Sequence, residues 1–78
     1  MSTKAYVLIE TAVGKTREVA AALRNLPGIQ SADVVTGPYD IIAIVEGTDL
    51  GSIGDMVTGN VHVIGGITRS VTCLSVGE

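Results

Sequence analysis

The sequence predicts an α+β fold in which two helices lie on one face of a four-stranded antiparallel sheet, in the chain order β-α-β-β-α-β. Two observations lead to this prediction. Four short stretches rich in aliphatic and β-branched residues flank two stretches of helical periodicity, and pairs drawn from Gly and Pro punctuate them. A chain of 78 residues has room for one hydrophobic core, so we expect a single domain over residues 1–78.

The first strand is expected over Lys4–Glu10, where five consecutive apolar residues lie between polar ones. Gly14 interrupts the chain, and the strong helix formers of Lys15–Asn25 follow. The apolar positions of this helix form one face: Val19, Leu23 and Leu26. Pro27-Gly28 ends the helix.

The two middle strands are expected over Ile29–Thr36 and Tyr39–Glu46, with a turn at Gly37-Pro38 between them. The gap is so short that the two strands should form an antiparallel hairpin. The second of these strands is the strongest β signal in the chain.

A second helix is expected over Leu50–Ile64, after an N-cap at Thr48-Asp49 and before Gly65-Gly66. Its predicted apolar face comprises Leu50, Ile53, Val57, Val61 and Ile64. The last strand is expected over Ile67–Val76. The complete order is that of the split βαβ, or ferredoxin-like, fold.

The first and third predicted strands are apolar on both faces. In the third strand, Ile42 and Ile44 point away from the side that carries Ile41, Ala43 and Val45. A monomer would expose a continuous aliphatic patch on the face without helices, and such patches mark interfaces. We therefore expect this face to pack on the same face of a second copy, giving a two-fold dimer.

Composition and charge exclude several classes of protein. The net charge is −3 with five basic residues spread along the chain, so we expect no direct nucleic-acid partner. No apolar stretch reaches the ~18 residues of a membrane span, and we expect a cytoplasmic protein without a membrane segment. A single cysteine and a single histidine leave no ligand set for a zinc site and no disulfide; no metal or cofactor is expected.

Catalytic residues are not evident in the sequence. Cys73 lies in an apolar strand and is expected to be a buried, unreactive thiol. His62 is expected at the helix terminus or surface, without a neighbouring carboxylate to orient it. Glu10 and Glu46 end antiparallel neighbours, so they should lie far apart. We therefore expect no enzyme.

The second predicted helix contains three glycines, Gly51, Gly54 and Gly59. Each costs a helix up to about 1 kcal/mol relative to alanine. They indicate either a marginal helix or a close backbone approach by a neighbour or a small ligand. The sequence leaves both interpretations open.

The stretch Thr36–Asp40 is the best candidate for a binding site. Gly37 can present a backbone amide, Tyr39 can cover a ligand, and the Asp40 carboxylate can hold an ammonium group. These groups suit a small zwitterion. In the alternative interpretation, Asp40 only caps its own turn.

The chain resembles the effector domain of the Lrp/AsnC regulators, also called the RAM domain (regulation of amino-acid metabolism). The resemblance covers residues from about Ala5 to Val76 and rests on three motifs: Leu26-Pro27-Gly28-Ile29, Gly37-x-Tyr39-Asp40, and Gly66-Ile67-x-x-Ser70-x-Thr72. It implies a dimer formed through the sheets, dimers assembled into rings, and amino-acid-like ligands bound at the seam between dimers. It also implies the site residues, which are Gly37, Tyr39, Asp40, Ser70 and Thr72.

Two departures from the family pattern bear on function. Full-length members carry an N-terminal helix-turn-helix domain that reads DNA, and we expect none in these 78 residues. Ser70 replaces the first threonine of a frequent Thr-x-Thr, and the second helix is richer in glycine than is usual.

The leading hypothesis is therefore a non-catalytic module that senses a small amino-acid-like effector and oligomerises. One alternative is a small dimeric enzyme of the cofactor-free monooxygenase or isomerase type, because the fold hosts both classes. Another is a purely structural partner that co-assembles with full-length Lrp/AsnC regulators.

Overall fold

A computed structural model describes residues 2–76 of the chain. The elements follow the predicted order, with a short π-helical segment, η1, directly after the second helix. Their bounds are β1 (Thr3–Thr11), α1 (Thr16–Arg24), β2 (Ile29–Val34), β3 (Ile41–Gly47), α2 (Leu50–Met56), η1 (Val57–Val61) and β4 (Ile67–Leu74). The predicted ferredoxin-like βαββαβ order is confirmed.

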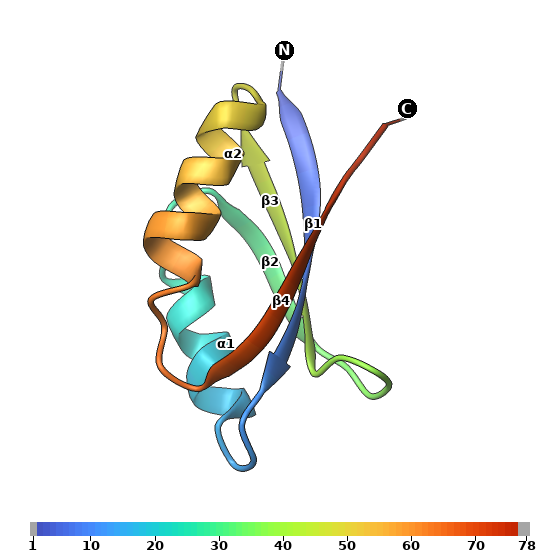
Figure 1. The fold of residues 1–78 in the computed structure, drawn as a ribbon, viewed down its shortest axis with the longest axis vertical. Coiled ribbons are helices and arrows are strands. Elements are labelled where there is room, and N and C mark those ends of the chain that lie inside the picture. Colours follow the sequence, from blue (N-terminus) through green and yellow to red (C-terminus); the bar gives the residue numbers. More distant parts are fainter. Residues whose placement is uncertain (1, 77–78) are drawn as a thin grey trace.

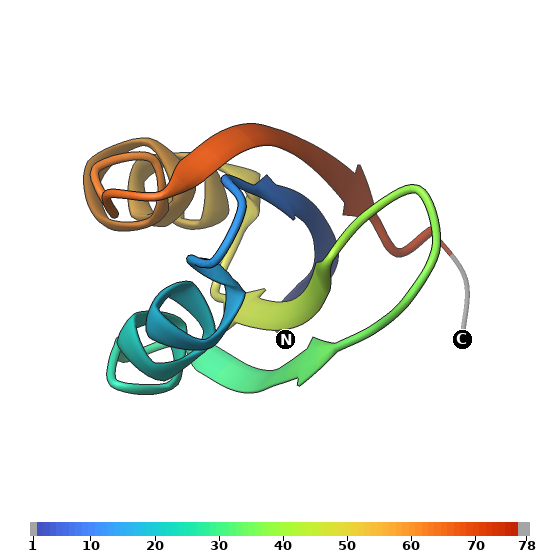
Figure 2. The same cartoon turned by 90° about the horizontal axis from the view of Figure 1, so that it is seen from below.

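The four strands form one antiparallel sheet in the order β2-β3-β1-β4, so β2 and β4 are its edges. Both helices cover the same face of this sheet, and the other face carries no helix (Figures 1 and 2). Across the centre of the sheet, Val7 of β1 lies opposite Ala43 of β3 and Thr72 of β4. The sheet therefore has a helix-covered face and a face without helices, which we call the open face.

The core lies between the helices and the central strands. Alternate residues of the central strands are fully buried there: Ala5, Val7, Ile9, Ile41, Ala43 and Val45. The helices and β2 contribute Val19, Ala20, Leu23, Ala32, Ile53, Val57 and Val61. Burial of each large aliphatic side chain stabilises the fold by about 1.5–3 kcal/mol. Gly66, at a φ of +101°, lets the turn before β4 close on α1, where an added Cβ would lie 3.0 Å from Val19.

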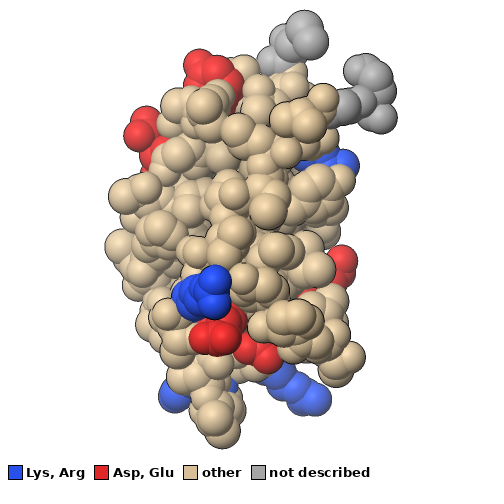
Figure 3. All heavy atoms as spheres, turned by 45° about the vertical axis from the view of Figure 1, so that its right-hand side comes forward, with Lys and Arg blue, Asp and Glu red and all other residues tan. Residues whose placement is uncertain are grey.

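The open face carries the aliphatic surface that the sequence predicted. Tyr6 lies opposite Ile44, and Leu8 lies opposite Ile42, on the side away from the helices. Both isoleucines and Leu8 are only half-buried in the single chain. Figure 3 brings this side forward, and its charged side chains gather toward the lower end and the rims.

The prediction that Cys73 is buried is wrong for the single chain, in which the thiol is exposed. Cys73 lies opposite Tyr6, and Tyr6 is one of the residues that point away from the helices. The alternation of β4 therefore places the thiol on the open face rather than in the core.

The second helix differs from its predicted form. It begins as predicted after Asp49, whose side chain accepts a hydrogen bond from the Ser52 N–H in a capping box (2.8 Å). It ends as an α-helix at Met56 and continues as a π-helix to Val61, not to Ile64 as predicted. Three glycines weaken the α-helical preference of this stretch, and the wider π turn keeps Val57 and Val61 buried. Leu50 is 60% exposed rather than buried, because it lies in the first turn, before the helix reaches the core.

The connection between β2 and β3 is longer than the predicted turn and spans residues 35–40. It leans out on the side away from the helices (Figures 1 and 2). Tyr39 and Asp40 belong to this loop and not to β3, which was predicted to start at Tyr39. Among the residues that the structure describes, no helix is long and apolar enough to cross a membrane.

Candidate functional site

Asp40 anchors the β2–β3 loop to the end of β1. Its Oδ2 accepts hydrogen bonds from the Thr11 N–H (2.8 Å) and the Thr11 hydroxyl (3.2 Å). Its backbone N–H donates to the carbonyl of Ile9 (2.9 Å), and its carbonyl accepts from the Val35 N–H (2.8 Å). One interpretation of the sequence was that Asp40 caps its own turn. Its carboxylate instead binds the end of the neighbouring strand β1.

Gly37 and Tyr39 occupy the exposed part of the same loop. Gly37 has a φ of +143°, a conformation that side-chain-bearing residues rarely adopt. The Tyr39 ring lies beneath the guanidinium of Arg69, with the Cζ atom 5.9 Å from the ring centroid. Arg69 pairs with Glu10, which belongs to the alternate set of β1 that faces away from the helices. Tyr39 therefore belongs to the open side of the sheet.

Ser70 and Thr72 lie on the other side. They pair with Ile9 and Val7, two buried residues of the helix-covered face. The Ser70 hydroxyl lies 2.9 Å from Nε2 of His62, within hydrogen-bond distance. Within one subunit the five predicted site residues therefore form two groups: the loop residues with Arg69, and the β4 hydroxyls near α2 and η1.

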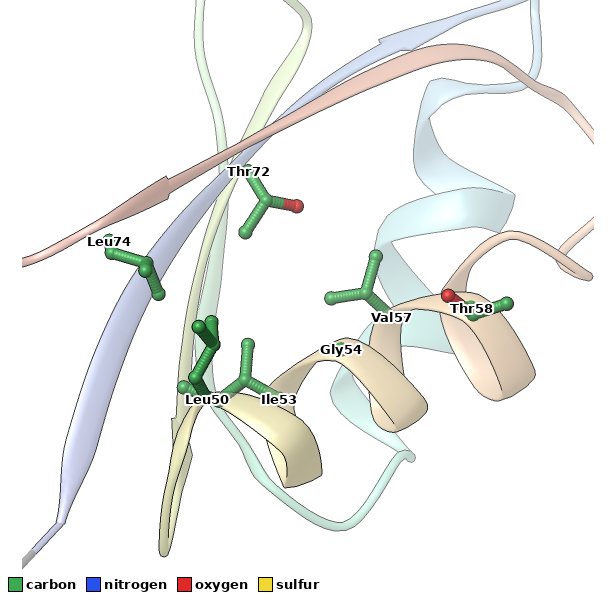
Figure 4. A pocket seen from close by; sticks show the side chains of 7 residues that line it. All are labelled: Leu50, Ile53, Gly54, Val57, Thr58, Thr72 and Leu74. Carbon is green, nitrogen blue, oxygen red and sulfur yellow. The ribbon is translucent and has the colours of Figure 1, made fainter.

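A pocket opens between α2, the start of η1 and β4, with a volume of about 350 Å³ (Figure 4). The described residues that line it are Leu50, Ile53, Gly54, Val57, Thr58, Thr72 and Leu74. None of these is charged, and the threonine hydroxyls are their only polar side-chain groups. This pocket suits an apolar group.

A second, polar concavity of about 340 Å³ lies along the first half of β4. Its described lining comprises His62, Ile67, Thr68, Arg69 and Ser70. Ser70 lies at one pocket and Thr72 at the other, so the two concavities adjoin along a single strand. This arrangement was not predicted from the sequence, in which His62 has no neighbouring carboxylate; its partner is the Ser70 hydroxyl of β4.

The acidic residues do not form a catalytic pair. Glu46 lies opposite Lys4, whereas Glu10 lies opposite Arg69 near the other end of β1, as predicted. The Ser52 backbone N–H and hydroxyl hold the pKa of Asp49 below its ordinary value. This shift belongs to the helix cap. Among residues 2–76, no three His, Cys, Asp or Glu side chains are grouped so that they could hold a metal ion.

No other segment of the chain packs closely against the three glycines of the second predicted helix. An added Cβ at Gly54 or Gly59 would meet no heavy atom within 4 Å, and one at Gly51 would meet only Asp49 at an ordinary distance. The sequence left two interpretations open, a marginal helix or a close approach to the glycines. Within the described chain, no neighbouring segment packs closely on them. Gly54 instead lies at the wall of the apolar pocket.

The Lrp/AsnC ligand binding domain matches residues 4–78. An uncharacterised helix-turn-helix transcriptional regulator of Pyrococcus horikoshii is 31% identical over 96% of the chain, which spans about half (52%) of that relative's length. A crystal structure of a Thermus thermophilus protein, TTHA0845, is 30% identical with a TM-score of 0.92, and the match covers 97% of this chain and 95% of that one.

A regulator from Neisseria meningitidis, solved as a complex with L-methionine, shares the fold with a TM-score of 0.87 at 20% identity. That match covers 97% of this chain and 51% of the regulator. The motifs at Leu26–Ile29, Gly37–Asp40 and Gly66–Thr72 lie within the residues matched by the Lrp/AsnC domain. The chain belongs to the Lrp/AsnC ligand-binding domain family.

Proposed function

We propose that this chain is a non-catalytic sensor of a small amino-acid-like effector that acts as a homo-oligomer. The observation that carries the proposal is the match of the Lrp/AsnC ligand-binding domain to residues 4–78. A regulator of the same fold was solved with L-methionine bound, which supports an amino acid as the class of effector. The curated relatives are transcriptional regulators, which supports a cytoplasmic location.

The open face of the sheet is the proposed dimer interface. It is formed by half-buried or exposed residues of the central strands and β4, one aromatic and four aliphatic: Tyr6, Leu8, Ile42, Ile44 and Val71. A second copy offers the same apolar surface, and a two-fold axis closes the contact. Dimers would then assemble into rings, as the family resemblance implies. Co-assembly with full-length regulators is the alternative partner.

The effector site is proposed to lie between subunits. Tyr39 and Arg69 lie together on the open side, whereas Ser70 and Thr72 face α2 and η1, so one subunit does not bring all five residues together. A neighbouring subunit can place its own loop of residues 37–40 beside the hydroxyls of Ser70 and Thr72. The Oδ2 atom of Asp40 accepts two hydrogen bonds from Thr11, whereas its Oδ1 atom accepts none from the described residues. Oδ1 is the atom proposed to receive the ligand's ammonium group.

An enzymatic role has less support. His62 is exposed, and its described partner is the Ser70 hydroxyl rather than a carboxylate that would orient it as a base. Among the described residues no three His, Cys, Asp or Glu side chains are grouped as a metal site, and Glu10 and Glu46 lie near opposite ends of β1.

A thermal-shift screen of the twenty amino acids tests the sensing function. A ligand that binds only the folded state adds about 2.7 kcal/mol at 100 times its Kd. For a domain of this size that should raise Tm by roughly 10–20 °C. One amino acid, or a chemically related group of them, should stabilise the protein strongly. A screen in which none changes Tm at millimolar concentration would contradict the proposal.

A further inference from the structure

We propose that Thr16 is a positioning residue that acts through Thr11 to fix the direction of the Asp40 carboxylate. This inference deepens the proposed sensing function and rests on it for its consequence, because Asp40 is the residue proposed to receive the ligand's ammonium group. The observation behind it is a chain of hydrogen bonds between half-buried side chains, from the start of α1 to the loop before β3.

The chain of hydrogen bonds joins three side chains. The Thr11 hydroxyl oxygen lies 2.7 Å from the Thr16 hydroxyl oxygen and 3.2 Å from Oδ2 of Asp40. The Thr11 backbone N–H donates to the same Oδ2 (2.8 Å). Thr11 is the last residue of β1, Thr16 is the first residue of α1, and Asp40 directly precedes β3. The end of β1, the start of α1 and the β2–β3 loop therefore meet at one polar cluster.

The direction of these hydrogen bonds follows from the chemistry of the groups. An ionised carboxylate only accepts, so the Thr11 hydroxyl donates its single proton to Asp40. The Thr11 oxygen can still accept, and the Thr16 hydroxyl is therefore the donor of the 2.7 Å bond. A hydroxyl that accepts a hydrogen bond becomes a stronger donor itself. Thr16 thus strengthens the bond that holds the Asp40 carboxylate.

The backbone of Asp40 is held by other groups. Its N–H donates to the carbonyl of Ile9 (2.9 Å), and its carbonyl accepts from the Val35 N–H (2.8 Å). These two bonds fix where Asp40 lies but do not fix the rotation of its side chain. The bonds from Thr11 hold Oδ2 toward β1 and leave Oδ1 without a hydrogen bond from the described residues. The direction of Oδ1 is therefore the property that Thr11 and Thr16 control.

A purely structural role of Thr16 would be confined to α1. The N-cap of this helix is Lys15, whose side chain makes no capping hydrogen bond. A hydroxyl at the next position could in principle stabilise the first turn alone. The described partner of the Thr16 hydroxyl is instead the Thr11 hydroxyl of β1. The two roles differ in which amides should respond when the hydroxyl is removed.

Amide hydrogen exchange of the ligand-free chain, followed by NMR, separates the two roles. Thr16→Val keeps the β-branched shape and removes the donor. The amides of Thr11 and Asp40 should then exchange about fivefold faster, the effect of one hydrogen bond. The amide of Leu23 in α1 should keep its wild-type rate. Thr16→Ser retains the hydroxyl and should restore the wild-type rates at Thr11 and Asp40.

Thr58→Val is the matched control for the exchange measurement. Thr58 is helical and exposed, and its hydroxyl makes no hydrogen bond with the described residues. Its replacement should leave the amides of Thr11 and Asp40 unchanged. A double-mutant cycle tests whether Thr16 acts through Thr11. Thr11→Val should already produce the whole effect, so that adding Thr16→Val causes no further acceleration.

The consequence for sensing is measured with the twenty free L-amino acids as probes. The amino acid that most raises the Tm of the wild type should bind Thr16→Val about fivefold more weakly in calorimetry. It should bind Thr16→Ser as it binds the wild type. Rescue by serine would show that the hydroxyl, and not the packing of the side chain, is required.

Four results would overturn the inference. Exchange could accelerate in α1 but not at Thr11 and Asp40, or Thr16→Ser could behave like Thr16→Val. The effects of Thr11→Val and Thr16→Val could add in full, or the affinity of Thr16→Val could equal that of the wild type. If no amino acid stabilises the wild type, the sensing function fails, and the exchange rates of the ligand-free chain still decide whether Thr16 positions Asp40.

Discussion

The two βαβ halves of the chain share one topology but cover their edge strands differently. In the first half, α1 buries Val19, Ala20 and Leu23, and its last-turn Arg24 donates from Nε and Nη2 to the edge carbonyl of Ala32 (3.1 and 2.6 Å). In the second half, none of the eight residues of β4 is fully buried, and two adjoining concavities lie along the strand. The helix of the first half therefore packs closely beside its edge strand, whereas the second half leaves concavities beside β4.

The difference follows from residue choice and not from topology. The first helix has three consecutive alanines, whereas the second has three glycines and becomes a π-helix after Met56. Small side chains and a widened turn leave space beside β4 that larger side chains would fill. Two halves of one topology can thus differ in how tightly their helices cover the edge strand.

The largest expected effect concerns the central strands that both halves share. Ile44→Asp places a charge in the proposed dimer interface, where burying an unpaired charge costs several kcal/mol. The variant should lose the dimer, and the chain should become insoluble or unfold. Light scattering and the soluble fraction measure this. Val13→Asp is the control, because Val13 is fully exposed outside the sheet, and it should stay dimeric. A wild-type chain that is a well-folded monomer at micromolar concentration would refute the interface.

The next effect compares one leucine from each helix. Leu23 is fully buried, so Leu23→Ala should lower the free energy of unfolding by about 2–5 kcal/mol. Leu50→Ala, at an exposed position of α2, should change it by about 0.5 kcal/mol or less. Urea denaturation of both variants measures the difference. Equal losses would mean that the second helix is packed as tightly as the first.

Asp40 tests how the loop that connects the two halves is held. Asp40→Asn removes the charge that accepts the Thr11 N–H and hydroxyl, and it should cost about 1 kcal/mol of stability. If the same carboxylate holds the ligand's ammonium, effector binding should also weaken by about 1.5–3 kcal/mol. Calorimetry with the best amino acid separates the two roles. An unchanged affinity would leave Asp40 a purely structural residue.

The smallest expected effect comes from exchanging glycine and alanine, the residue types that distinguish the two helices. Gly54→Ala should stabilise the fold by up to about 1 kcal/mol, because alanine is the better helix former and its Cβ meets nothing. Ala21→Gly, at an exposed position of α1, should destabilise the fold by a similar amount. Thermal unfolding of the two variants checks the signs. A Gly54→Ala variant that is less stable than the wild type would contradict the free space around Gly54.

The fold could be predicted from sequence because its signals are local. The apolar runs of β1 and β3, the alanine-rich α1 and the glycines that follow each helix each point to one element. The concavities beside β4 could not be predicted in this way. The contact between His62 and Ser70 joins a helix end to the last strand, and the bond between Thr11 and Asp40 spans 29 positions. Neither pairing leaves a pattern in a short window of sequence.

Two misjudged residues have the same cause. Cys73 and Leu50 are apolar and sit in apolar stretches, so periodicity assigned them to the core. Their exposure depends on which side of β4 faces the helices and on where α2 begins relative to the sheet. Register and helix placement are properties of the assembled fold.

Amide chemical shifts during a titration with the amino acid that most raises Tm test the account most directly, because they report on both halves of one molecule at once. The largest changes should occur at Ser70, at Thr72 and in the loop of residues 37–40, which are proposed to bind the effector. The amides of Arg24 and Ala32, where α1 packs closely beside β2, should stay unchanged. Changes concentrated at Arg24 and Ala32, or none at a saturating concentration of the amino acid, would contradict the account.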